Sequence, residues 1–138
     1  MRWVIASVLV AACGHAPPVK VEAEEEPVTG VATLAGTWLT NDDMDWLYRL
    51  RIGADGRFVM SVDRAKLGTC EQRGTIAQYG EGASFMLTIT RDSCSNSEGG
   101  SLPFTIPSFT GDKMTLAYKI GTAKTKRFYS RDPKVPRK

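Results

Sequence analysis

The sequence has almost no histidine: His15 is the only one in 138 residues, and it lies near the N-terminus. This scarcity disfavours catalysis by a positioned imidazole and metal sites built from several histidines. The chain also has no Gly-x-Ser-x-Gly nucleophile motif and no glycine-rich phosphate-binding loop. Its length corresponds to one domain and is short for a two-domain enzyme. We therefore expect a protein that is not an enzyme and that needs no cofactor and no metal.

Long hydrophobic runs are also scarce. The clearest one, residues 3–12, follows Arg2 and is too short to cross a hydrocarbon core about 30 Å thick, so it predicts a secretory signal. The run ends in Val10-Ala11-Ala12-Cys13, which resembles the lipobox of bacterial lipoproteins. The resemblance implies that residues 1–12 are a signal peptide and that Cys13 carries a lipid anchor, and Gly14 in place of Asp favours the outer membrane. The alternative is an ordinary secretory signal in which Cys13 is incidental.

The two ends of the chain have little apolar patterning. Residues 13–34 contain prolines and an acidic run without a period of 2 or 3.6, which predicts a lipidated cysteine followed by a disordered linker. Residues 132–138 form a basic tail behind a basic last strand, which either meets anionic lipid or an acidic partner or is simply solvated. Nucleic acid is not expected as a partner, because the chain is exported and Phe128 and Tyr129 are adjacent rather than spaced for stacking.

The dominant pattern of residues 35–131 is alternation of apolar and polar side chains, with no amphipathic helical repeat. Trp46, Tyr48, Leu50 and Ile52 occupy alternate positions, and the same period of 2 recurs up to the end of the region. The positions between them hold Leu47, Arg49 and Arg51. Turn sequences such as Gly53-Ala54-Asp55-Gly56 separate the runs. The pattern predicts strands near residues 37–40, 46–52, 58–62, 68–79, 85–90, 102–106, 114–120 and 123–130. We therefore predict an all-β domain, an eight-stranded antiparallel up-and-down barrel.

Cys70 and Cys94 remain as an even pair once Cys13 is set aside, which predicts a disulfide in an oxidising compartment. A hairpin register in which Tyr79 faces Phe85 also brings Cys70 opposite Cys94. By parity the cysteines would then lie on the face opposite to the apolar residues, unless a bulge intervenes. A redox-active pair is the alternative, but the C-x-x-C spacing is missing.

Several short motifs resemble the lipocalin-like barrels found in small bacterial lipoproteins. Gly36-Thr37-Trp38 matches the G-x-W signature of the first strand, and Asp55-Gly56-x-Phe58 and Gly111-Asp112-x-Met114 fit the frame around it. In that family the tryptophan plugs one end of the barrel and an arginine of the last strand packs on it. The resemblance implies that Gly36, Trp38 and Arg127 close this barrel.

Bulky side chains on the inward-facing positions allow two interpretations of the interior. They either line a cup for a small apolar ligand or fill the barrel as its core. The residues in question are Trp46, Tyr48, Phe58, Met60, Phe85 and Tyr118. The first interpretation predicts a non-enzymatic envelope lipoprotein, lipid-anchored on the periplasmic face of the outer membrane, that binds a small apolar ligand. The second predicts a filled barrel that acts as a protein-interaction or inhibitory module of an envelope complex.

Overall fold

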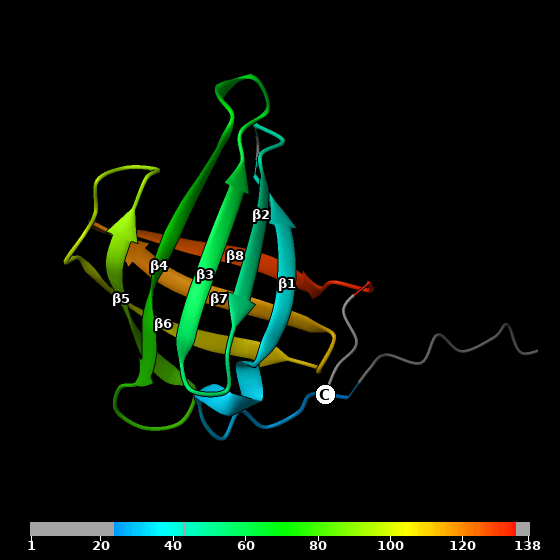
Figure 1. Ribbon diagram of the computed structural model, residues 1–138. Coiled ribbons are helices and arrows are strands. Elements are labelled where there is room, and N and C mark those ends of the chain that lie inside the picture. The colour runs from blue at the N-terminus through cyan, green and yellow to red at the C-terminus, as the bar shows by residue number, and fades with distance from the viewer. Residues whose placement is uncertain (1–23, 43, 135–138) are drawn as a thin grey trace, which may run out of the picture.

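The computed structural model describes residues 24–42 and 44–134, so Cys13 and the predicted signal peptide lie outside the described residues. Eight antiparallel strands follow one another around a closed barrel, and β1 pairs with β8 to complete it (Figure 1). The strands are β1 (Gly36–Asn41), β2 (Leu47–Ile52), β3 (Arg57–Asp63), β4 (Thr69–Gln78), β5 (Ser84–Asp92), β6 (Ser101–Phe109), β7 (Lys113–Ile120) and β8 (Ala123–Arg131). The predicted up-and-down barrel is confirmed.

Alternation along each strand explains why these segments form a barrel. In β2 the side chains of Tyr48, Leu50 and Ile52 are buried, whereas those of Arg49 and Arg51 are exposed. In β7, Met114 and Leu116 are buried in the same way. Successive side chains of a strand point to opposite faces, so the buried apolar sets of these strands face the interior and drive closure.

One end of the barrel is plugged by a short 3-10 helix, η2 (Val31–Leu34). Leu34 and Trp38 are fully buried there, and the Trp38 indole Nε1–H donates a hydrogen bond to the Leu34 carbonyl at 2.9 Å. The backbone N–H of Glu26 also donates to the Phe109 carbonyl at 2.7 Å. The linker therefore does not extend to residue 34 as predicted: a stretch rich in valine and leucine before β1 folds against the barrel end, because this buries apolar surface that would otherwise remain open.

The arginine that packs on Trp38 is Arg131, not Arg127. The guanidinium carbon of Arg131 lies 4.2 Å from the centre of the Trp38 ring, and its N–H groups donate to the carbonyls of Gly111 and Ala35. The prediction of Arg127 in this role was wrong because β8 pairs with β1 through Arg131 and Trp38. Arg127 lies four residues earlier, about 13 Å along the strand.

Gly36 belongs to the same closure, as predicted. Its φ is +139°, and a Cβ there would come within 2.1 Å of the Arg131 guanidinium. A larger residue would therefore displace the arginine from the Trp38 ring. The predicted tail is also partly folded: Asp132 is buried, its backbone N–H donates to the Thr37 carbonyl, and its carboxylate pairs with Arg49.

Candidate functional site

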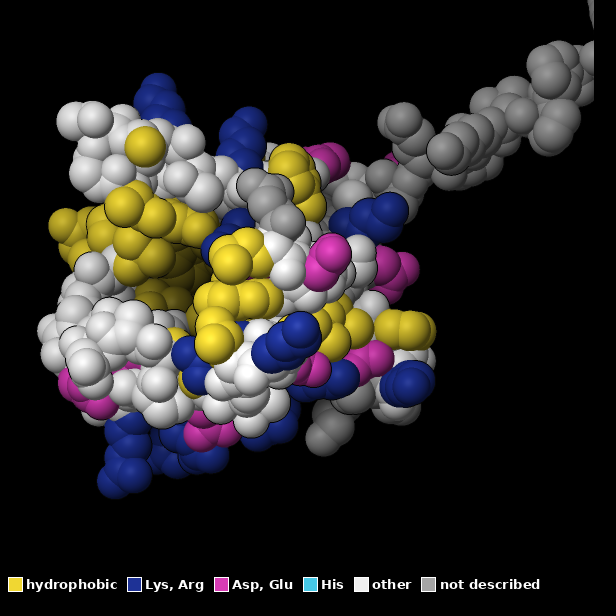
Figure 2. Space-filling view, turned by 90° about the horizontal axis from the view of Figure 1, so that it is seen from above, with side chains coloured by type: hydrophobic (Ala, Val, Ile, Leu, Met, Phe, Trp, Pro, Cys, Tyr) yellow, Lys and Arg dark blue, Asp and Glu magenta, His cyan; other side chains and the backbone are white. Residues whose placement is uncertain are grey.

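The barrel contains a cavity of about 640 Å³. Its lining includes Trp46 of the β1–β2 loop, Arg64 of the β3–β4 loop, and Ser95 and Ser97 of the β5–β6 loop. These loops surround the end opposite to η2, where Figure 2 shows a hollow lined by hydrophobic side chains. A volume of several hundred cubic ångströms is typical of small-molecule sites. One end of the barrel is thus plugged, and the other leads into a cavity that a ligand can enter.

Most of the predicted lining residues do face this cavity. Its wall contains Trp46, Tyr48, Phe58, Met60 and Tyr118, together with Leu50, Leu87, Ile89 and Leu116. Phe85 lines a second hollow beside the β4–β5 turn instead of this cavity, so the prediction that it shares one cavity wall with the others was wrong. Phe85 is fully buried at the closed half of the barrel, where its ring stacks on Phe104 with the centroids 5.5 Å apart. The alternation along β5 correctly predicts that Phe85 faces the interior of the barrel. It does not tell whether an inward-facing residue lies in the plugged half or in the hollow half.

Arg127 projects into the cavity among aromatic side chains. Its guanidinium carbon lies 4.3 Å from the centre of the Tyr48 ring, and Tyr118 and Tyr129 share the same cavity wall. Burial lowers the pKa of Arg127, but the neighbouring tyrosines outweigh it and leave this pKa above its ordinary value. Burial also raises the pKa of Tyr129 to about 12. Arg127 is therefore charged and Tyr129 is neutral over the whole physiological range.

Tyr48 connects this cluster to the first loop. Its hydroxyl donates a hydrogen bond of 2.8 Å to the carboxylate of Asp42, which also accepts the backbone N–H groups of Met44 and Trp46. Burial acts to raise the pKa of Asp42, but these hydrogen bonds outweigh it and hold the pKa below its usual value. Asp42 thus fixes both the turn that carries Trp46 and the orientation of the Tyr48 ring.

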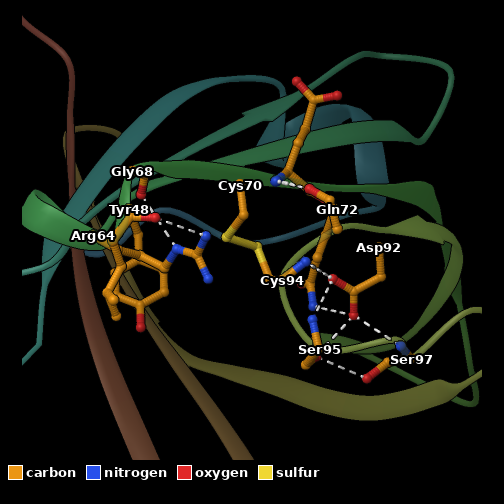
Figure 3. The surroundings of a disulfide bond; sticks show 12 residues. Tyr48, Arg64, Gly68, Cys70, Gln72, Asp92, Cys94, Ser95 and Ser97 are labelled. Carbon is orange, nitrogen blue, oxygen red and sulfur yellow. Dashed lines mark hydrogen bonds between the residues drawn. A yellow bond between two sulfur atoms is a disulfide. The ribbon is translucent and has the colours of Figure 1, made fainter.

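The disulfide lies at the rim of the cavity. Cys70 and Cys94 are bonded, with their Cα atoms 5.1 Å apart, and both line the cavity. Figure 3 shows Tyr48 and Arg64 on one side of the bond and a network around Asp92 on the other. The bond ties β4 to the β5–β6 loop, so it fixes one edge of the opening. The predicted pairing is confirmed.

Asp92 holds the β5–β6 loop in place, a role that was not predicted for it from the sequence. Its buried carboxylate accepts the backbone N–H groups of Cys94, Ser95 and Ser97, and the side chains of Gln72 and Ser95 also donate to it. Burial acts to raise its pKa, but the bonds from Ser95 and the backbone outweigh it and hold the pKa far below the ordinary value. An aspartate followed by a serine-rich run is a signal for such a turn.

A second hollow of about 490 Å³ lies beside the β4–β5 turn. Its lining comes from that turn and from β5 to β8, and includes the exposed side chains of Tyr79, Lys119, Lys124 and Lys126. The lysines belong to β7 and β8, so several of the basic residues near the C-terminus are strand residues rather than tail. Among the described residues, no group of three or more His, Cys, Asp or Glu side chains is placed to hold a metal ion.

In comparisons with known proteins, no protein-family model, curated protein or solved structure matches the chain significantly. The closed barrel is compatible with the lipocalin-like fold that the sequence resembles. Within residues 24–42 and 44–134, no helix is long and apolar enough to cross a membrane. The cavity and the N-terminal sequence are therefore the features that bear on function.

Proposed function

We propose that this protein is a non-enzymatic envelope lipoprotein, anchored through Cys13, whose barrel binds a small apolar ligand. The observation that carries the proposal is the cavity of about 640 Å³ behind an open rim. A filled barrel, as expected for a pure protein-interaction module, would place side chains in this space. An empty apolar cavity forfeits packing contacts, so its retention favours a ligand as the occupant.

Rigid walls also support a binding role. The rim is held by a covalent bond between Cys70 and Cys94 and by the carboxylates of Asp42 and Asp92, each of which accepts several hydrogen bonds. A cavity whose walls are fixed before binding loses little conformational entropy when a ligand enters. The closed end, with Leu34 and Trp38 fully buried, leaves the loop end as the route into the cavity.

The anchor follows from the lipobox-like sequence that ends at Cys13. Acyl chains contribute about 0.8 kcal/mol per buried CH₂, so two or more chains hold a protein stably at a membrane. A barrel on such an anchor would bind its ligand at the envelope. We prefer the outer membrane as the site of anchoring, because the residue after Cys13 is Gly14 and not an aspartate.

Mass spectrometry of the full chain tests both halves of the proposal. Under denaturing conditions the mature wild-type chain should carry an acyl-lipid mass that Cys13→Ala lacks. Under native, detergent-free conditions Cys13→Ala should carry a non-covalent mass of a few hundred daltons. Trp46→Ala, which removes part of the cavity wall, should reduce the bound fraction, whereas Phe128→Ala on the exposed face of β8 should not. A bare mass from the native host would contradict ligand binding and favour the protein-interaction module.

A further inference from the structure

The charges that line the cavity are all of one sign. Among the described residues of its wall, Arg64 and Arg127 are the charged side chains, and no Asp or Glu is present. Arg64 belongs to the β3–β4 loop at the rim, where it donates hydrogen bonds to the carbonyls of Leu67 and Gly68. Arg127 lies further inside, on β8. A ligand in this cavity therefore meets a positive potential as well as an apolar wall.

Arg127 is held inward without a described carboxylate as an ion-pair partner. Asp42 lies outside the cavity wall and interacts electrostatically with Arg127, but its carboxylate is engaged by the Tyr48 hydroxyl, and Arg127 packs on the face of the Tyr48 ring. A guanidinium presents five N–H donors, and the Tyr48 side chain engages only part of them and supplies no formal negative charge. Placing a cation in an apolar cavity is costly unless a counter-charge is supplied. A ligand can supply it.

Position along the barrel separates the polar and apolar parts of the cavity. Tyr48 is near the start of β2, close to the rim, and it clusters with Val62 and Cys70. Phe58 and Leu50 lie toward the plugged end, in the cluster that contains Leu34 and Trp38. The guanidinium stacked on Tyr48 thus lies in the half of the cavity nearer the rim, and the apolar wall lies deeper.

We propose that the ligand is a single-chain amphiphile with an anionic headgroup, such as a carboxylate, which pairs with Arg127 while its hydrocarbon chain lies along Phe58, Leu50 and Leu116. This inference rests on the proposed function, because it names the class of ligand that the cavity binds. The size agrees: at roughly 30 Å³ per heavy atom, the volume of a water in the liquid, the cavity of about 640 Å³ holds about twenty heavy atoms. A chain of about a dozen carbons with its headgroup fits this volume.

A matched set of ligands tests the inference on the full chain carrying Cys13→Ala. Dodecanoate, dodecanol and dodecyltrimethylammonium share one chain and differ in headgroup charge, and isothermal titration calorimetry below their aggregation limits measures each affinity. We expect dodecanoate to bind at least about tenfold more tightly than dodecanol, because a charge-assisted hydrogen bond is stronger than a neutral one. The cation should bind most weakly.

Variants at adjacent positions of β8 assign the preference to one side chain. Arg127→Met should remove the advantage of dodecanoate and leave the affinity for dodecanol unchanged, and Arg127→Lys should restore part of the advantage. Lys126→Met removes the same charge from the outward face of the strand and should keep the wild-type preference. Persistence of the dodecanoate advantage in Arg127→Met would overturn the assignment.

The wild-type series separates the two proposals even if Arg127→Met folds poorly. Equal affinity for dodecanoate and dodecanol would overturn the anionic headgroup and leave the apolar-ligand function standing. Binding of none of the three ligands would contradict the proposed function itself. Tightest binding of the cation would overturn the inference and point instead to recognition by the tyrosine faces.

Discussion

Arg127 and Arg131 lie on the same face of β8 but have different roles, because their neighbours differ. Arg131 packs on the Trp38 ring and donates to two backbone carbonyls at the plugged end. Arg127 packs on Tyr48 inside the cavity. The sequence alone predicts that both point inward, but it does not give the register between β8 and β1, which are separated by almost the whole domain. The correct class of residue was therefore assigned to the wrong position.

Replacing each arginine with methionine should separate a structural role from a binding role. Arg131→Met loses a cation–π contact and two hydrogen bonds, so we expect the free energy of unfolding to fall by about 2–3 kcal/mol. Arg127→Met exchanges a half-buried cation that has no ion-pair partner among the described residues for an apolar side chain, and it should change stability by less than about 1 kcal/mol. Urea unfolding followed by tryptophan fluorescence measures both. A larger loss in Arg127→Met than in Arg131→Met would contradict this division.

Strands and turns are the elements that the sequence predicts best, because alternation and turn residues are local signals. Bulges are harder. Near the turn, β5 is paired one residue out of the predicted register, with Gln78 rather than Tyr79 opposite Phe85. An irregularity between Arg73 and Gly74 then leaves Thr90 as an extra residue, and from there on the strands follow the register that places Cys70 opposite Cys94, with Gln72 paired to Asp92. The bulge turns Cys94 to the inner face, where Cys70 already lies on the same side of β4 as the buried Ile76. Gly74 allows the bulge, since a Cβ there would lie 1.8 Å from the Thr88 carbonyl oxygen.

Removing the disulfide should loosen one element before the rest. The bond closes a segment with a sequence separation of 24 residues. The double variant Cys70→Ala/Cys94→Ala should therefore lose about 3 kcal/mol of unfolding free energy in the chain-entropy model. Because the bond also ties the β5–β6 loop to β4, amide hydrogen exchange in residues 93–100 should rise more than in β1 or β2. Uniform acceleration over all strands would argue that the bond stabilises the barrel only globally.

At the scale of the whole molecule, the barrel has one plugged end and one hollow end. The sequence predicts which side chains face inward, but not whether they meet, because the interior volume depends on strand tilt and on what closes each end. Trp38, Phe109 and Leu34 fill the end near η2. At the other end, polar loops held by Asp42 and Asp92 surround the opening and leave it unfilled. The open half of the candidate site is thus a property of the assembled barrel rather than of a motif.

Carboxylates at both ends predict how the molecule responds to acid. Hydrogen bonds hold the pKa of Asp42 and Asp92 at the rim below their ordinary values despite burial, and the backbone N–H of Lys134 does the same for Asp132 beside β1. In the unfolded chain each carboxyl would titrate near 3.8, the ordinary pKa of an aspartate. The unfolded state therefore binds more protons in acid, and stability must fall as pH falls.

We expect the free energy of unfolding to be nearly constant from pH 7 to about pH 5 and to decrease steadily below the unfolded pKa. Urea titrations at a series of pH values measure this directly. Asp92→Asn should lower stability at neutral pH, because an amide offers the N–H donors of Ser95 and Ser97 one oxygen instead of two. It should also make the loss of unfolding free energy below pH 5, the acid limb, less steep. Asp55→Asn, at an exposed turn, is the matched control and should leave the limb unchanged. If acid instead stabilised the wild type, the assignment of these carboxylates as charged hydrogen-bond acceptors would be wrong.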